Sequence, residues 1–160
     1  TAALGLAMRA WGDGLRILIL QFIKGGWKYG ELEALAALNR LDGRLVVRQC
    51  GKGFTQRDDE NLKEHQRAAQ EALSQAKVEI QSEKWDLVIL DEINYAVKFH
   101  LLFEEDVLEL IAQKPAALHL VLTGRDARPA ILEVADLVTE MRMIKHPFQK
   151  GIKAQKGIEF

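Results

Sequence analysis

Two adjacent carboxylates, Asp91 and Glu92, follow a run of four apolar residues, Leu87 to Leu90. This pattern is typical of a Walker B strand, in which a buried strand carries carboxylates at its tip. Mg²⁺ prefers oxygen ligands, and a carboxylate at a rigid strand end can orient the ion. An aspartate at such a position also often caps the following helix. Taken alone, the motif therefore indicates either a magnesium site or a helix cap.

Glycines, charged residues and aromatic residues also follow the other apolar runs of the chain. Residues 24–31 follow the first run, residues 51–56 follow the second, and residues 123–125 follow the fourth. The interiors of these runs carry almost no polar residues. Because ligands bind beyond the carboxyl ends of the strands in parallel sheets, this segregation predicts a polar site along one edge of a sheet.

Short apolar runs alternate with helical stretches, and this alternation predicts the fold class. The expected strands are residues 15–22, 44–49, 86–91, 117–122 and 135–140. The expected helices are residues 1–11, 31–38, 58–81, 104–112 and 128–134. Strands that are apolar throughout and separated by helices indicate an α/β fold, with a mostly parallel sheet and helices on both faces.

Composition narrows the class of protein further. The 160 residues suit a single domain spanning 1–160, and 48% hydrophobic with 28% charged residues excludes a disordered chain. The net charge of −1 argues against a dedicated nucleic-acid-binding surface. Apolar runs are too short to span a membrane, and we expect no export signal. The single cysteine, Cys50, favours a reducing compartment. We therefore expect a cytoplasmic protein without nucleic-acid or membrane partners.

Several sequence blocks occur in a defined order, and their combination is specific. They are Gln21-Phe-Ile-Lys-Gly25, Gly53-Phe-Thr55, Leu87-Val-Ile-Leu-Asp-Glu92, Thr123-Gly-Arg125 and the closing Gly151 to Phe160. With these blocks the chain resembles the corrinoid adenosyltransferases of the CobA/CobO/BtuR type over essentially its whole length.

The resemblance implies a fold and a reaction. The expected fold is a RecA-like P-loop NTPase fold. The expected enzyme is a transferase that moves the 5′-deoxyadenosyl group of ATP to Co(I) of a reduced corrinoid and releases triphosphate, in adenosylcobalamin biosynthesis or salvage. The family also implies Mg²⁺, a homodimer, and a reduced flavoprotein as electron donor.

The resemblance also implies roles for individual residues at the nucleotide, and Thr1 is among the expected cofactor-binding residues. Asp91 and Glu92 become the metal-side carboxylates. Arg9 and Glu31 take positions that meet the nucleoside half of ATP, although a solvated helix charge and a first-turn acid are the ordinary interpretations of these two residues. Arg125 becomes a fixed cation for the triphosphate, whose oxygens suit its planar guanidinium.

At the corrin, the resemblance points to the segment Gly53-Phe54-Thr55-Gln56. An apolar side chain such as Phe54 excludes the lower axial ligand of cobalt, which makes reduction to Co(I) easier. Relatives carry a tryptophan where this chain has Gln56, so one of the two aromatic side chains expected against the corrin is replaced here. Gln56 fills space but lacks an aromatic surface.

The phosphate-binding pattern G-x-x-x-x-G-K-[ST] does not occur in the sequence. In P-loop folds the strand that leads into this loop lies inside the sheet, so its loss would leave a slot of unpaired backbone groups. We therefore expect that residues 1–160 lack an N-terminal strand and a phosphate loop located just before Thr1, where a loop hydroxyl would complete the metal coordination.

Two other functions remain open from the sequence. One is a non-catalytic corrinoid- or nucleotide-binding module, which would bind a corrinoid without ATP. The other is a generic P-loop ATPase, which would release phosphate without a corrinoid.

Overall fold

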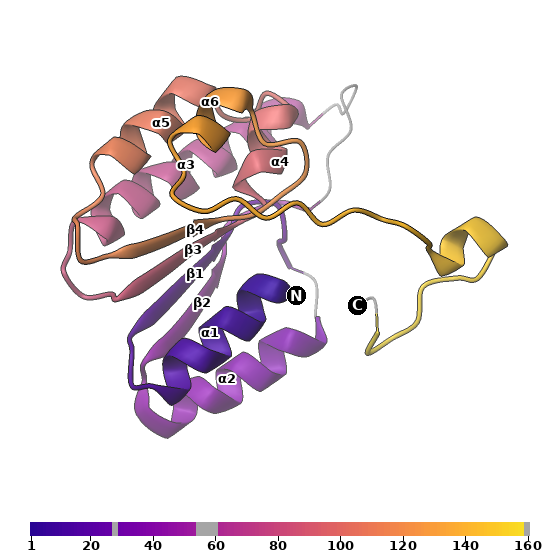
Figure 1. Cartoon of the computed structure of the whole chain (residues 1–160), viewed down its shortest axis with the longest axis horizontal. Coiled ribbons are helices and arrows are strands. Elements are labelled where there is room, and N and C mark those ends of the chain that lie inside the picture. Colours follow the sequence, from indigo (N-terminus) through magenta and orange to yellow (C-terminus); the bar gives the residue numbers. More distant parts are fainter. Residues whose placement is uncertain (27–28, 54–60, 159–160) are drawn as a thin grey trace.

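Four parallel strands form the centre of the molecule. The computed structural model describes residues 1–26, 29–53 and 61–158. The strands are β1 (Ile17–Gln21), β2 (Leu45–Gln49), β3 (Leu87–Asp91) and β4 (His119–Leu122), in the order β2-β1-β3-β4. They are in register, with Ile17 opposite both Leu45 and Leu87. All four carboxyl ends therefore meet at one edge of the sheet, which we call the carboxyl edge (Figure 1).

Helices cover both faces of this sheet. The helices α1 (Ala2–Gly12) and α2 (Gly30–Asp42) lie on one face, and α3 (Leu62–Ile80), α4 (Ile93–Lys98), α5 (Glu104–Ala112) and α6 (Pro129–Glu133) lie on the other (Figure 1). A short 3-10 helix, η1 (Pro147–Lys150), follows in the C-terminal segment. The α/β class with a parallel sheet between two helical layers is therefore confirmed.

The apolar run of β1 serves two cores at once. Successive side chains of a strand point to opposite faces. Ile17 and Ile19 accordingly pack in the cluster with α1 and α2, whereas Leu18 and Leu20 pack in the cluster with α3 and α4. All four side chains are completely buried. Truncating one of them, such as Ile19, to alanine would cost about 2–5 kcal/mol of stability.

Most expected elements are present with small shifts of their bounds. The helix expected over residues 104–112 is α5 without change, and the first four expected strands correspond to β1 to β4. The helix α4, which begins at Ile93 directly after the two carboxylates, was not among the expected elements.

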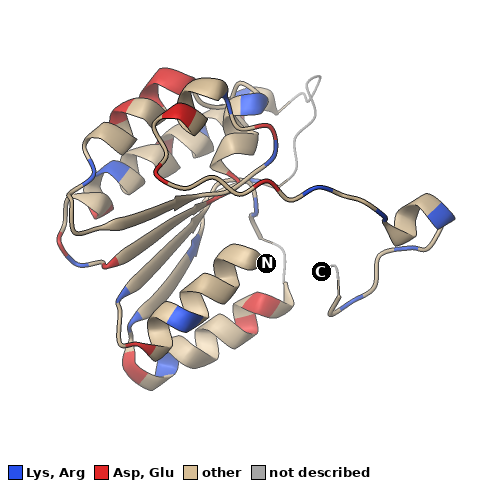
Figure 2. Cartoon of the chain, viewed as in Figure 1, with Lys and Arg blue, Asp and Glu red and all other residues tan. Residues whose placement is uncertain are grey.

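The fifth expected strand, residues 135–140, is wrong. This segment has no strand structure, and Leu137 and Val138 are largely exposed. A short apolar segment forms a strand only where it can pair with a neighbouring strand of a sheet. Here the chain runs away from the sheet and its helices after α6 (Figure 1). Lysines and arginines are spaced along this departing segment (Figure 2).

The slot expected for a missing strand is not found between the described strands. β3 pairs directly with β4, with Leu87 opposite His119 and Leu90 opposite Leu122. The hydrogen-bonded order is therefore unbroken from β2 to β4. Across the described ranges, the structure has no helix with the length and apolarity needed to cross a membrane.

Candidate functional site

Asp91 lies at the centre of the carboxyl edge and is held from both sides. Gln21 is its direct neighbour in register on β1. The Gln21 Nε2 atom donates a hydrogen bond to Asp91 Oδ2 at 3.3 Å, and the Thr123 hydroxyl donates to Asp91 Oδ1 at 2.9 Å. Each carboxylate oxygen thus has a partner from a different neighbouring strand segment, so the orientation of the carboxylate is restricted.

Glu92 adds a second carboxylate beside Asp91. Its backbone adopts a left-handed conformation with φ 64°, and its N–H donates to the Thr123 hydroxyl at 2.9 Å. Burial and the neighbouring charge of Asp91 raise the pKa of Glu92, while Lys24 and Arg125 oppose this shift. Glu92 occupies the position before the first turn of α4, but its side chain makes no capping hydrogen bond. The helix-cap interpretation of the motif therefore leaves this carboxyl group unused.

Lys24 supplies the positive charge that faces these acids. Its Nζ atom lies 2.9 Å from Glu31 Oε1 and 3.8 Å from Asp91 Oδ2, and 4.8 Å from the centre of the Tyr29 ring. Burial alone would lower the pKa of Lys24, but the hydrogen bond to Glu31 and the charge of Asp91 outweigh it and raise the pKa. Lys24 therefore remains a cation that bridges the Asp91 carboxylate at the end of β3 and the Glu31 carboxylate in the first turn of α2.

Glycines allow the strand-end loops to approach one another closely. A Cβ atom at Gly25 would overlap the Gly51 carbonyl oxygen, and one at Gly51 would overlap the Ile23 carbonyl oxygen. The Gly51 N–H also donates to the carbonyl oxygens of Gln21 and Lys24, both at 3.2 Å. Only glycine fits at these two crossings, and together they hold the loop that carries Lys24.

A third glycine holds the loop after β4. Gly124 has φ +130°, and a Cβ atom there would lie 2.8 Å from the Tyr95 backbone nitrogen. The carbonyl oxygen of Thr123 accepts a hydrogen bond from the Asn94 N–H at 3.1 Å. These contacts press Thr123 against the start of α4, which places its hydroxyl between Asp91 and Glu92.

The structure brings some of the expected site residues together and separates others. Asp91, Glu92 and Glu31 share one cluster with Lys24. Arg125 is exposed and reaches Glu92 by charge alone. Thr1 precedes α1, whose first turn lies on the side of the sheet's carboxyl ends (Figure 1).

Arg9 does not join this cluster. It lies exposed in the last turn of α1, and within the described ranges no hydrogen bond or ion pair connects its side chain to the carboxyl edge. Phe54 and Gln56, expected against the corrin, lie outside the described residues.

Gln21, Lys24 and Thr123 were not among the expected site residues. Each is a polar residue at or just after the end of an apolar strand, which is the signal that could have identified them. Their contacts with Asp91 join positions that are distant in sequence, so no local pattern predicts these contacts.

The donors at the carboxyl edge fit Mg²⁺ better than a metal held entirely by protein ligands. No group of three or more His, Cys, Asp or Glu suited to a metal occurs in the described part of the chain. Mg²⁺, however, is usually bound by one or two carboxylates together with phosphate oxygens and water. Asp91 and Glu92 supply such a pair at adjacent positions.

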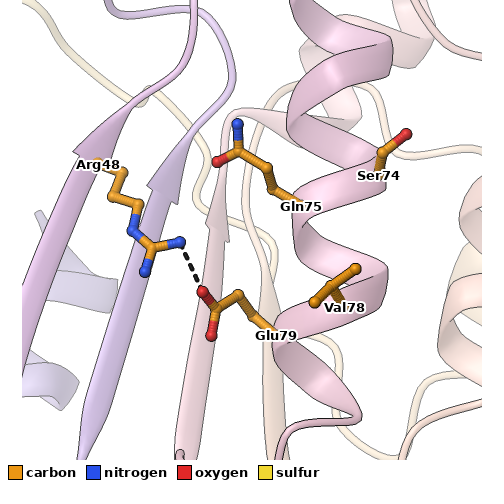
Figure 3. Close-up of a pocket in the computed structure, with 5 residues that line it drawn as sticks. All are labelled: Arg48, Ser74, Gln75, Val78 and Glu79. Atoms are coloured by element: carbon orange, nitrogen blue, oxygen red, sulfur yellow. Dashed lines mark hydrogen bonds and ion pairs between the residues drawn. The ribbon is translucent and has the colours of Figure 1, made fainter.

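An open hollow of about 320 Å³ lies elsewhere, between β2 and α3 (Figure 3). It is lined by Arg48, Ser74, Gln75, Val78 and Glu79. Arg48 Nη1 bonds Glu79 Oε1 at 2.7 Å, so the two charged groups of the hollow neutralise each other. None of these residues belongs to the Asp91 cluster, and the candidate site is therefore the carboxyl edge.

Comparison with known proteins gives the family of this chain. The sequence model of the family described as ATP:corrinoid adenosyltransferase BtuR/CobO/CobP matches residues 1–160. A corrinoid adenosyltransferase of Pseudomonas aeruginosa is 39% identical over 166 residues, covering 100% of this chain and 77% of the relative. Those of Sinorhizobium sp and Escherichia coli are each 38% identical over 161 residues, covering 100% of this chain and 74% and 79% of the relatives. This chain therefore belongs to the ATP:corrinoid adenosyltransferase family.

Proposed function

We propose that this chain transfers the 5′-deoxyadenosyl group of ATP to the Co(I) centre of a reduced corrinoid. Cobalt supplies the electron pair of the new cobalt–carbon bond, the bond between C5′ and the triphosphate oxygen breaks, and the triphosphate leaves with the electron pair of that broken bond. The observation that carries the proposal is the Asp91, Glu92, Glu31 and Lys24 cluster at the carboxyl edge, in a chain matched by the family over its whole length.

Asp91 and Glu92 would hold Mg²⁺, which neutralises negative charge on the leaving triphosphate. Gln21 and Thr123 restrict the orientation of Asp91 through its two oxygens. Burial, and then repulsion by the neighbouring Asp91 carboxylate, raise the pKa of Glu92. A bound cation would relieve that repulsion, and this electrostatic argument supports a metal between the two residues.

Lys24 and Glu31 would orient the nucleotide beside the metal. Burial by itself would raise the pKa of Glu31, but the hydrogen bond and the charge of Lys24 outweigh burial and keep the pKa lowered. Glu31 therefore stays ionised as an acceptor for the nucleoside half of ATP. Arg125 would serve the triphosphate from its exposed position, and Arg9 would meet the nucleoside only if the nucleotide extends along α1.

The remaining parts of the proposal concern features beyond the described cluster. Phe54 and Gln56 would contact the corrin. A RecA-like P-loop architecture, a homodimer and a reduced flavoprotein as electron donor complete the proposed system. The strand and phosphate loop expected before Thr1 stay a prediction.

The test is a transfer assay with the purified full-length product of the native reading frame, ATP, Mg²⁺ and chemically reduced cobalamin. The absorbance of cob(I)alamin should convert to the light-sensitive spectrum of adenosylcobalamin, with one triphosphate released for each corrinoid. Bound corrinoid without conversion would favour a binding module, and phosphate release without corrinoid would favour an ATPase. Either of these results would overturn the proposed reaction.

A further inference from the structure

Gln21 is an exception within the most deeply buried strand of the sheet. The four preceding residues of β1 are apolar, whereas Gln21 is polar and only 1% exposed. Its Oε1 atom is buried and has no hydrogen-bond partner in the described residues. A buried acceptor without a partner loses its hydration and gains nothing in return, so it destabilises the fold. Packing alone does not explain a glutamine at this position.

The hydrogen bond that Gln21 does make is directed at Asp91. An ionised carboxylate only accepts hydrogen bonds, so the amide NH₂ of Gln21 must face Asp91 and its carbonyl oxygen must point elsewhere. The unsatisfied Oε1 atom is therefore a consequence of the contact between Nε2 and Asp91 Oδ2. The unfavourable burial of Oε1 and the contact of Nε2 with the carboxylate therefore have the same cause, which is the orientation of the Gln21 amide.

Gln21 and Thr123 act on the same carboxylate from opposite sides. They come from the segments of β1 and β4, the two strands that flank β3. Gln21 bonds Oδ2 and Thr123 bonds Oδ1, so rotation of the carboxylate would break at least one of the two bonds. Groups that support a metal ligand in this way orient it and tune its affinity.

We propose that Gln21 is a positioning residue that orients Asp91 for its ligand at the expense of fold stability. The inference rests on the proposed function, in which Asp91 is a metal-side carboxylate. Gln21 itself acts through Asp91 and is not a catalytic residue.

The decisive variant is Gln21→Met, which has a similar shape and no hydrogen-bonding amide. Removal of the unsatisfied oxygen should raise the Tm of the ligand-free protein by about 2–6 °C. The same variant should bind Mn²⁺ in the presence of ATP about 10–100-fold more weakly, as measured by electron paramagnetic resonance of free Mn²⁺. A residue with only a structural role would give the opposite change in Tm and no change in metal affinity.

Thr123→Val provides a second variant, because it releases the other oxygen of Asp91. It should weaken Mn²⁺ binding to a similar extent. Asp86→Asn, at the opposite end of β3, is the control and should leave Mn²⁺ affinity unchanged.

The variant Asp91→Asn tests the metal role of Asp91 separately from the positioning role of Gln21. Unchanged Mn²⁺ affinity in Asp91→Asn would overturn the metal role of Asp91 and the inference that depends on it. Weaker binding in Asp91→Asn, together with an affinity within twofold of the parent in Gln21→Met, would overturn the role of Gln21 alone. A lower Tm for Gln21→Met would overturn the idea that its burial costs stability.

Discussion

The two ends of the β1–β3 pair hold a carboxylate in contrasting ways. At the amino end, the Arg16 guanidinium donates to both oxygens of Asp86, at 3.0 and 2.8 Å, and its backbone N–H adds a third bond at 2.8 Å. These bonds lower the pKa of Asp86 to about 2. At the carboxyl end, Gln21 gives Asp91 one bond of 3.3 Å, and a second carboxylate follows directly.

Within this one pair of strands, the amino end is arranged for stability and the carboxyl end for function. In the amino-end pair the two charges balance and both Asp86 oxygens accept hydrogen bonds, and the pair lies at the surface. The carboxyl end instead gathers three carboxylates around Lys24 and buries an unsatisfied oxygen. Such an arrangement is unfavourable for the empty fold, and a bound cation would stabilise it. This contrast identifies the carboxyl end as the functional one.

The largest expected effect follows from neutralising the carboxylate at the functional end. Asp91→Asn should reduce the rate of adenosyl transfer by about 100-fold or more, because a metal-side charge is lost. Its Tm should change little, since the amide keeps much of the shape. Rates measured with reduced cobalamin and saturating ATP provide the test, and a rate within threefold of the parent would contradict the assignment.

The backbone that supports this end should be similarly sensitive. Gly124→Ala should destabilise the protein by about 2–4 kcal/mol, because its Cβ atom would press on the Tyr95 nitrogen and the Asn94 side chain at φ +130°. Urea unfolding measures this change. Gly12→Ala, at the end of α1 with no atom within 4 Å of the added Cβ, is the matched control and should differ from the parent by less than about 1 kcal/mol. Equal effects at both glycines would show that the close approach is not tight.

The hydroxyl of Thr123 should have a smaller effect on the reaction. Thr123→Val preserves shape but leaves the Glu92 N–H without its acceptor and Asp91 Oδ1 without its donor. We expect the transfer rate to fall about tenfold and the free energy of unfolding to fall by about 1–3 kcal/mol. In a double-mutant cycle with Asp91→Asn the two effects on rate should not add, because both act through the same carboxylate. Strict additivity would argue against that coupling.

The smallest expected effect belongs to the amino end and depends on pH. The folded pKa of Asp86, about 2, lies below its ordinary value of 3.8. Its ion pair therefore contributes stability above pH ~4, and that contribution is lost as the pH falls through about 2. Because the pair is exposed, Asp86→Asn should cost only about 0.5–1 kcal/mol at neutral pH.

Unfolding measured over a series of pH values tests whether the charge of Asp86 is what stabilises the amino end. The stability difference between Asp86→Asn and the parent should shrink as the pH is lowered from 4 toward 2, while transfer activity at neutral pH stays unchanged. A constant difference across this range would mean that Asp86 stabilises the fold by something other than its charge.

The sequence predicted much of this molecule because the relevant signals are local. The apolar runs Ile17 to Leu20 and Leu87 to Leu90 predicted a sheet buried on both faces, and the Asp91-Glu92 pair predicted carboxylates at a strand tip. Residues 135–140 show the limit of the same signal. Whether a short apolar run becomes a strand depends on a partner edge, and its own residues do not encode that partner.

Only the tertiary structure revealed how the site is organised. Gln21 and Thr123 lie 70 and 32 positions from Asp91, and their roles follow from strand order and register. Lys24 reaches two carboxylates because Gly25 and Gly51 let separate loops cross. The sequence by itself determined most of the element types, the family and the candidate carboxylates, since these depend on neighbouring residues. Packing decided which oxygens are held, because hydrogen bonds between strands exist only after the strands have met.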